Sequence, residues 1–174
     1  MKFGWLVDEP LMLMAIAGIL FASWPFPLDK AGFKGLDSPT AFALGQLIYL
    51  LCYSISRDIR AHNPSAAIAT GVIVFILASY AYLKLNGPGI RWDLLAFSCI
   101  MSSTGLICMM RMLGLVTTAG GARSLYLAGQ ILISGAVSMA IYLAFNPKDI
   151  TYGRLMGFVM VFPTIILIYT KGNR

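Results

Sequence analysis

Charged residues are scarce in this sequence: Lys, Arg, Asp and Glu make up 11% of its 174 residues. A soluble domain carries roughly 25% charged residues. A chain of this size exposes too much surface to hide the difference in a core. Hydrophobic residues make up 59%, and the mean hydropathy is +0.80. The composition therefore argues against a soluble domain and predicts that the lipid bilayer is the solvent.

Residues that bind metals or perform catalysis are equally few. Cys52, Cys99 and Cys108 all fall in apolar segments without a CxxC spacing, which is typical of small buried hydrophobes. The single histidine, His62, lies in a polar loop. A His/Cys metal site, a serine triad and an acid–base pair all lack parts. We expect no metal, no cofactor and no enzyme activity.

The net charge of +6 comes from basic residues scattered one or two per loop. Nucleic-acid binding needs them gathered in one patch, so we expect no nucleic-acid partner. Cationic loops beside lipid headgroups account for the charge, and membrane lipids are the expected partners.

Six apolar segments have the length of a membrane span, which is about 20 residues for a helix. They run over residues 6–26, 39–56, 65–83, 93–116, 123–145 and 151–170. Turn-forming residues separate them, and Asp37, Ser38, Asp93 and Thr151 are candidate N-caps. The pattern predicts an all-α, polytopic integral membrane helix bundle of about six transmembrane helices. We expect residues 1–174 to form a single integral membrane domain.

Orientation is weakly encoded. Six spans place both termini on one side, which carries six or seven Lys and Arg residues against six on the other. The positive-inside rule therefore gives almost no preference. Two interpretations stay open: one fixed topology with a weak signal, or insertion in both orientations.

Arg111 is a permanent cation inside the fourth segment, five residues before its end. That is roughly 7 to 8 Å along a helix, and a long guanidinium can snorkel across it. Alternatively, Arg111 faces the bundle interior and binds an anionic group, because an intramembrane cation needs a partner. Arg123, which closes the Gly/Thr/Ala patch at 114–121, would add a second charge.

Polar side chains recur at helical spacing in two segments. Gln46 and Tyr49 share one face of the second segment, and Tyr126 and Gln130 share one face of the fifth. Such stripes hold helices together or bind substrate. Trp24 lies where two prolines should kink the first segment, at the membrane interface or at a cavity mouth. The candidate substrate-binding residues are Trp24, Gln46, Tyr49, Arg111, Arg123, Tyr126 and Gln130.

Small residues form a second signal. Gly153 and Gly157 make a GxxxG pair, which favours close helix packing in lipid. The patch at 114–121 fits the same interpretation. The alternative is that its glycines loosen a helix end, so that backbone amides approach a polar ligand.

Two stretches resemble a known family. "MAIAGILFASWPFPLDKAGFKGLDSPTAFALGQLIYLL" is similar to the first two helices of the drug/metabolite transporter superfamily, EamA-like branch. "LICMMRMLGLVTTAGGARSLYLAGQILISGAVSMAIYLAFNPKDITYGRLMGFVMVFPTIILIY" is similar to the last three helices of one repeat. The chain has one more span than such a repeat. It also lacks, between Pro10 and Leu28, the glutamate of the small multidrug branch, which argues against proton-coupled cation export.

The resemblance implies a small transporter or flippase in a bacterial inner membrane. Its cargo would be a small polar or lipid-linked metabolite, with anionic cargo favoured by Arg111. Since the family uses two such units, the resemblance also implies a homodimer, for which an antiparallel arrangement is one option. The alternative is a non-transporting accessory, exclusion or immunity protein that contacts a membrane partner through its helices. A continuous polar cavity lined by the first, second, fourth and fifth segments would favour transport, and a solid core would favour the accessory protein.

Overall fold

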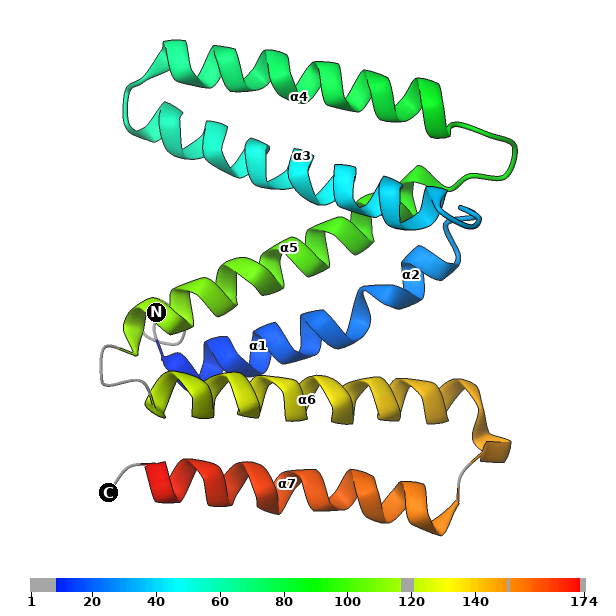
Figure 1. Cartoon of the computed structure of the whole chain (residues 1–174), viewed down its shortest axis with the longest axis vertical. Helices are drawn as coiled ribbons and strands as arrows, with labels where there is room; N and C mark the ends of the chain where they lie inside the picture. The colour runs from blue at the N-terminus through cyan, green and yellow to red at the C-terminus, as the bar shows by residue number, and fades with distance from the viewer. Residues whose placement is uncertain (1–8, 117–120, 150, 173–174) are drawn as a thin grey trace, which may run out of the picture. The chain divides into compact units, whose positions relative to one another are not determined.

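The computed structural model describes residues 9–116, 121–149 and 151–172, and its regular structure over these ranges is helical, without a strand (Figure 1). The all-α prediction is confirmed. The elements in chain order are α1 (Pro10–Ser23), α2 (Pro25–Asp29), α3 (Asp37–Arg60), α4 (Pro64–Leu85), α5 (Trp92–Leu115), α6 (Gly121–Phe145), the 3₁₀ turn η2 (Pro147–Asp149) and α7 (Tyr152–Gly172).

Five helical stretches of the described residues are long and apolar enough to cross a membrane. They are Pro10–Asp29, Asp37–Arg60, Pro64–Leu85, Trp92–Leu115 and Arg123–Phe145. The sixth predicted segment forms α7, a helix of 21 residues. Five of the six predicted spans are therefore found as spanning helices in the predicted order, and the sixth is found as a helix.

Local sequence signals explain some helix boundaries. α1 ends at Ser23 and α2 starts at Pro25, as the prolines predict, because proline lacks the N–H of an interior helical residue. The Arg154 N–H donates to Thr151 Oγ1 at 3.4 Å, which confirms Thr151 as the cap of α7.

Other predicted caps are wrong. α3 has Leu36 at its N-cap with no side-chain hydrogen bond, so Asp37 and Ser38 lie inside the helix. α5 starts at Trp92, so Asp93 also lies inside its helix, where it pairs with Arg91. A cap not predicted is Asn63, whose Oδ1 accepts from the Ala66 N–H at 3.3 Å.

The chain divides into two compact units. Unit 1 comprises Met1–Ser23 with Thr104–Arg174, and unit 2 comprises Trp24–Ser103. The prediction of a single integral membrane domain stays a prediction.

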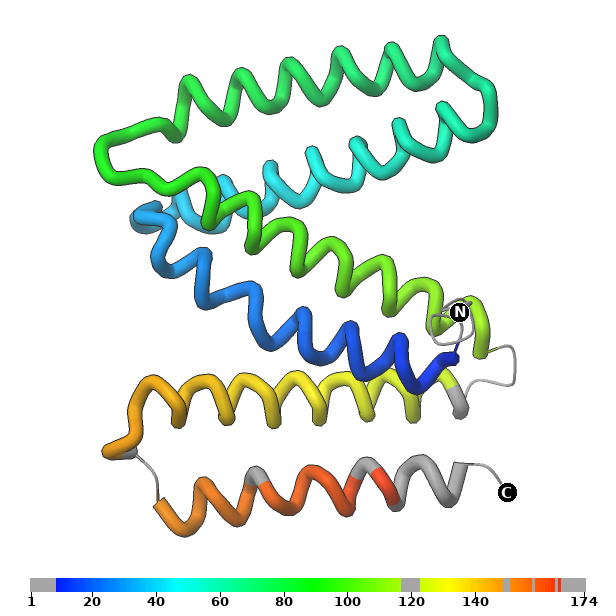
Figure 2. Tube along the Cα trace, turned by 180° about the vertical axis from the view of Figure 1, so that it is seen from behind, coloured from blue at the N-terminus to red at the C-terminus, as the bar shows by residue number. Residues whose placement is uncertain are grey.

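In unit 1, α6 packs against α1, which runs in the same direction, and against the antiparallel α7 (Figures 1 and 2). Glycines bring α1 and α6 together: a Cβ on Gly129 would lie 2.5 Å from Met14 Sδ. Met14, Leu13 and Met112 of α5 form the buried cluster. The start of α1 and the end of α7 lie at the same end of unit 1, as the prediction for the termini requires. The termini themselves, with Lys2 and Arg174, lie outside the described residues.

In unit 2, α3 and α4 form an antiparallel hairpin (Figures 1 and 2). Leu28 and Ala31 pack in the core with Ala41 of α3 and with Leu95 and Cys99 of α5. These contacts fix the first half of α5 against α3.

The loops at one end of unit 2 are joined through their backbones. The Arg91 N–H donates to the Ala31 carbonyl at 2.9 Å. Gly32 has a φ of +85°, and a Cβ there would lie 2.8 Å from the Gly89 carbonyl oxygen. Only glycine combines that conformation with so close an approach.

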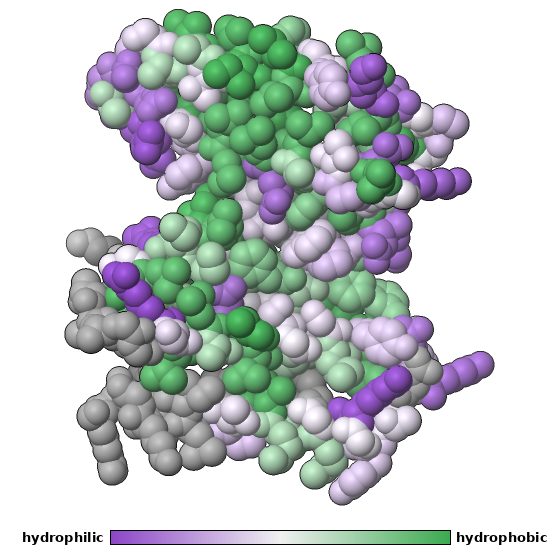
Figure 3. Space-filling view, viewed as in Figure 1, coloured by the Kyte–Doolittle hydropathy of each residue, from purple (hydrophilic) through white to green (hydrophobic). Residues whose placement is uncertain are grey.

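Large apolar side chains cover the outer faces of the helices. On α4, Phe75 is 73% exposed and Ile68 is 68% exposed. Figure 3 shows hydrophobic residues over the middle of the helices and hydrophilic residues gathered toward their ends. This distribution suits a surface that faces lipid chains, with headgroups at each end.

No described residue of the chain packs against the GxxxG pair. A Cβ on Gly153 or Gly157 would meet no described atom within 4 Å, and both glycines are exposed. Close packing of this pair against another helix therefore stays a prediction. In the other small-residue patch, Gly114 is also open, while residues 117–120 lie outside the described residues.

Candidate binding cavity

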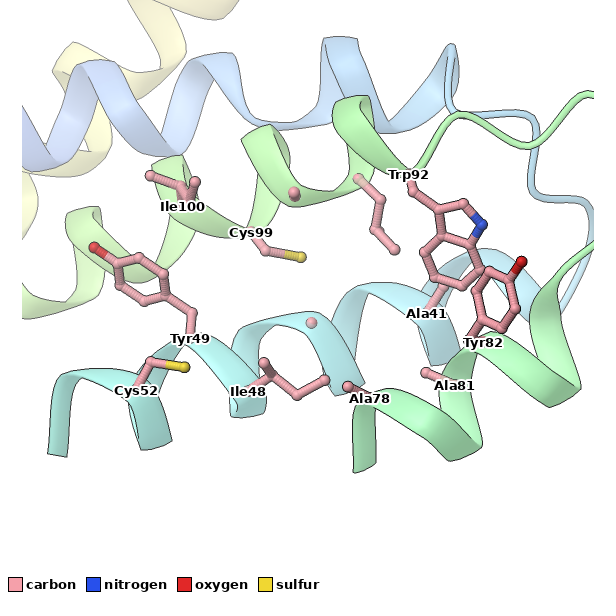
Figure 4. Close-up of a pocket in the computed structure, with 13 residues that line it drawn as sticks. Ala41, Ile48, Tyr49, Cys52, Ala78, Ala81, Tyr82, Trp92, Cys99 and Ile100 are labelled. Carbon is pink, nitrogen blue, oxygen red and sulfur yellow. The ribbon is translucent and has the colours of Figure 1, made fainter. Parts of the chain in front are cut away.

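Unit 2 contains a cavity of about 530 Å³ between α3, α4 and α5 (Figure 4). This volume lies in the range of about 300–1,000 Å³ that is usual for small-molecule sites. The lining residues are Ala41, Gly45, Ile48, Tyr49 and Cys52 of α3, Ala78, Ala81 and Tyr82 of α4, and Trp92, Leu95, Ala96, Cys99 and Ile100 of α5.

The cavity exists because small side chains line parts of all three helices. Five lining residues are alanine or glycine: Ala41, Gly45, Ala78, Ala81 and Ala96. At Gly45 the absent side chain also lets α3 approach Cys99 of α5 so closely that a Cβ would overlap its sulfur. The small side chains that allow α3 to pack against α5 therefore also leave space beside α4.

The lining is almost entirely apolar. It includes no charged residue, and its polar atoms belong to two tyrosines, two cysteines and Trp92. The Trp92 indole N–H already donates to Asn86 Oδ1 at 3.2 Å. A charged metabolite inside this space would lose its hydration without gaining a counter-charge, which costs several kcal/mol or more.

Polar groups beside the cavity bond to one another. Gln46 Nε2 donates to Ser102 Oγ at 2.7 Å and so links α3 to α5. Ser98 Oγ donates to the Trp24 carbonyl at 2.6 Å. Ser103 is fully buried, and its Oγ has no hydrogen-bond partner among the described residues. Ser98 and Ser102 therefore link α5 to neighbouring segments.

Aromatic and basic residues mark one end of the cavity. Trp92 contacts Phe33 edge to face, with ring centroids 5.6 Å apart, and lies 5.9 Å from the Tyr82 ring. Lys84 follows Tyr82 by two residues, and Arg91 Nη2 lies 2.6 Å from Asp93 Oδ2. That hydrogen bond raises the pKa of Arg91. Such a mixture is characteristic of the membrane–water interface.

The predicted site residues of unit 2 have different roles. Tyr49 lines the cavity. Gln46 is engaged with Ser102. Trp24 does not line the cavity: its ring stacks on Phe42 with centroids 4.1 Å apart.

The other four predicted residues belong to unit 1, so no described site joins all seven. The Arg111 side chain is exposed, and Arg123 Nε donates to the Val116 carbonyl at 3.1 Å near the end of α5. Tyr126 packs against the Leu13–Met14–Met112 cluster. Gln130 is 6% exposed, and its Oε1 has no hydrogen-bond partner among the described residues.

Most lining residues were not predicted from the sequence. Polar side chains guided the prediction, whereas this cavity is built from small and apolar ones. A usable signal was the spacing of small residues: Ala41 and Gly45 are four apart on α3, and Ala96 and Cys99 are three apart on α5. Such spacing indicates close packing as readily as a cavity, so it could not locate the site alone.

Taken together, the spanning helices define the class: this is a multi-pass helical membrane protein. No family model, curated protein or solved structure matches the chain. The resemblance to drug/metabolite transporters therefore stays a prediction.

Proposed function

We propose that this protein is a small membrane transporter or flippase for an amphipathic, lipid-linked cargo. An anionic lipid is the most direct probe of this activity. The observation that carries the proposal is the partly open cavity of about 530 Å³ between three helices of spanning length. Open space among spanning helices is what a cargo needs in order to leave the bulk lipid.

The nature of the cavity changes the expected cargo. A polar cavity lined by the first, second, fourth and fifth segments was expected of a transporter. The observed cavity is apolar and is lined by the second, third and fourth. An apolar lining supports the lipid-linked alternative over a small polar metabolite. The homodimer, its antiparallel arrangement and the bacterial inner membrane belong to the same proposal.

The test is a flipping assay with purified protein in liposomes. Anionic and zwitterionic phospholipids with a fluorescent headgroup are placed in both leaflets, and a membrane-impermeant reductant bleaches the outer one. The proposal expects bleaching beyond the outer-leaflet fraction, faster for the anionic lipid. Bleaching that stops at the outer-leaflet fraction for both lipids, as in protein-free vesicles, would overturn it.

A second candidate function is supported by α7. Its Gly153 and Gly157 are exposed and meet no described atom, so another protein's helix could approach closely there. An accessory, exclusion or immunity protein would use such a face. Replacing Gly157 with leucine should then abolish cross-linking to a membrane partner in cells while leaving flipping unchanged. Unchanged cross-linking would eliminate this use of the face.

A further inference from the structure

We infer that the cavity of unit 2 is a binding site for one hydrocarbon chain of a lipid or lipid-linked compound, with the polar headgroup at the Trp92 end. The inference deepens the proposed function by naming the part of the cargo that this site holds. It concerns binding, and it stands or falls independently of transport.

The walls of the cavity suit a hydrocarbon chain. Alkyl, aromatic and thiol groups from three helices face the space, and the buried thiol of Cys99 already donates to the Phe42 carbonyl at 3.6 Å. Water in a cavity needs about two to four polar partners, which these walls do not offer. A vacant cavity would forfeit dispersion contacts along its whole lining. A hydrocarbon chain restores them.

The cavity is elongated and leads toward the end of the helices. It runs from Tyr49, Cys52 and Ile100 at one end to Tyr82 and Trp92 at the other (Figure 4). The Trp92 end adjoins the loop residues that tie α2 to α5, where hydrophilic side chains begin. A lipid whose hydrocarbon chain lies along this axis therefore has its headgroup at the membrane–water interface.

Charged side chains surround the Trp92 end of the cavity. Near the Trp92 end, the ammonium groups of Lys34 and Lys84 are exposed, and no described carboxylate lies within ion-pair distance of either. Arg91 is already paired with Asp93. Asp29 and Asp37 also stand at this end and balance two of the three lysine charges there, which belong to Lys30, Lys34 and Lys84. The headgroup site is thus mildly cationic, and the hydrocarbon chain of the lipid contributes most of the recognition.

The experiment uses Trp92 as a fluorescent reporter, because it lines the cavity. Trp5→Phe and Trp24→Phe remove the other two tryptophans of the full-length chain. The protein is reconstituted into vesicles of phosphatidylglycerol with brominated or ordinary chains, and emission in the first is divided by emission in the second. A chain in the cavity brings bromine against the indole and quenches it.

Two substitutions fill the cavity and one serves as a control. Ala78→Phe on α4 and Ala96→Phe on α5 place a ring where the chain should lie, and each should remove most of the quenching. Ala69→Phe changes an exposed alanine of α4 that does not line the cavity. Its Trp92 fluorescence should be quenched as strongly as that of the reporter. Circular dichroism establishes that each variant is folded.

Equal quenching in the reporter and both cavity-filling variants, with native helical content, would overturn the inference. So would a change of oligomeric size in both variants without a change in quenching, because a second copy would then fill the space. If the cavity-filling variants lose quenching but the wild-type protein does not flip lipid, this inference is upheld and the proposed function is refuted. If the wild-type protein flips lipid but the cavity-filling variants are quenched as strongly as the reporter, the proposed function is upheld and this inference is refuted.

Discussion

Gly18 of α1 and Ile133 of α6 approach so closely that a Cβ on Gly18 would lie 2.7 Å from Cγ2 of Ile133. The same Cβ would lie 3.0 Å from the Gln130 carbonyl oxygen, a backbone atom that cannot move aside easily. The absence of a side chain at Gly18 is therefore a condition of packing in unit 1.

Gly18→Ala should destabilise the protein by about 1–3 kcal/mol, because overpacking forces α1 and α6 apart. The control is Gly135→Ala on α6, where a Cβ would meet no described atom within 4 Å. It should be neutral, or stabilising by up to about 1 kcal/mol, because alanine favours the helix over glycine. Thermal unfolding in detergent measures both. Equal melting temperatures for the two variants would show that α1 and α6 do not pack as described.

The hydrogen bond from Gln46 to Ser102 should contribute modestly to the stability of unit 2. Gln46→Leu and Ser102→Ala each remove it, and a double-mutant cycle should give a coupling of about 0.6 kcal/mol, the average for such bonds in a membrane protein. Unfolding in a denaturing detergent titration supplies the four free energies. Strict additivity would mean that the two side chains do not interact.

Arg111 is exposed and is not among the residues that line the cavity of unit 2. We therefore expect Arg111→Lys to retain full Trp92 quenching and full insertion, because lysine also snorkels. Arg111→Gln should lower the amount inserted and leave quenching of the inserted protein unchanged. If both variants insert normally but lose quenching, Arg111 belongs to the binding site after all. Its guanidinium geometry would then be required, since lysine keeps the charge but not the planar group.

Orientation can be tested through the loop at residues 146–149, where Pro147 and Lys148 are exposed. If the chain inserts both ways, two added lysines should shift the population strongly toward one orientation, because the existing Lys and Arg bias is nearly zero. Reporters at the C-terminus measure both populations. A single orientation in the unmodified protein would refute dual insertion.

The fold was largely predictable from the sequence, and the site was not. Apolar length alone locates the spanning helices, and Pro25 and Thr151 mark helix boundaries through local chemistry. Asp37 and Asp93 misled the prediction, because good capping residues also occur just inside a helix, where an acidic side chain suits the dipole.

The site depends on tertiary contacts that no local pattern reports. Tyr49 was identified by its polar face, but Ala78 and Ala96 gain meaning only because α4 and α5 flank the same space. Gly18 packs tightly while Gly157 is open, although glycine spacing alone favoured the latter. Which glycine is used depends on which helix faces it.

The central proposal is that lipid crosses the membrane by way of the cavity in unit 2. The most direct measurement is the flipping rate of headgroup-labelled phosphatidylglycerol in liposomes that contain the wild-type protein, Ala78→Phe or Ala69→Phe. The account predicts that the wild-type protein and Ala69→Phe flip the lipid at the same rate, and that Ala78→Phe lowers it several-fold. Equal rates in Ala78→Phe and the wild-type protein, or no flipping by either, would contradict it.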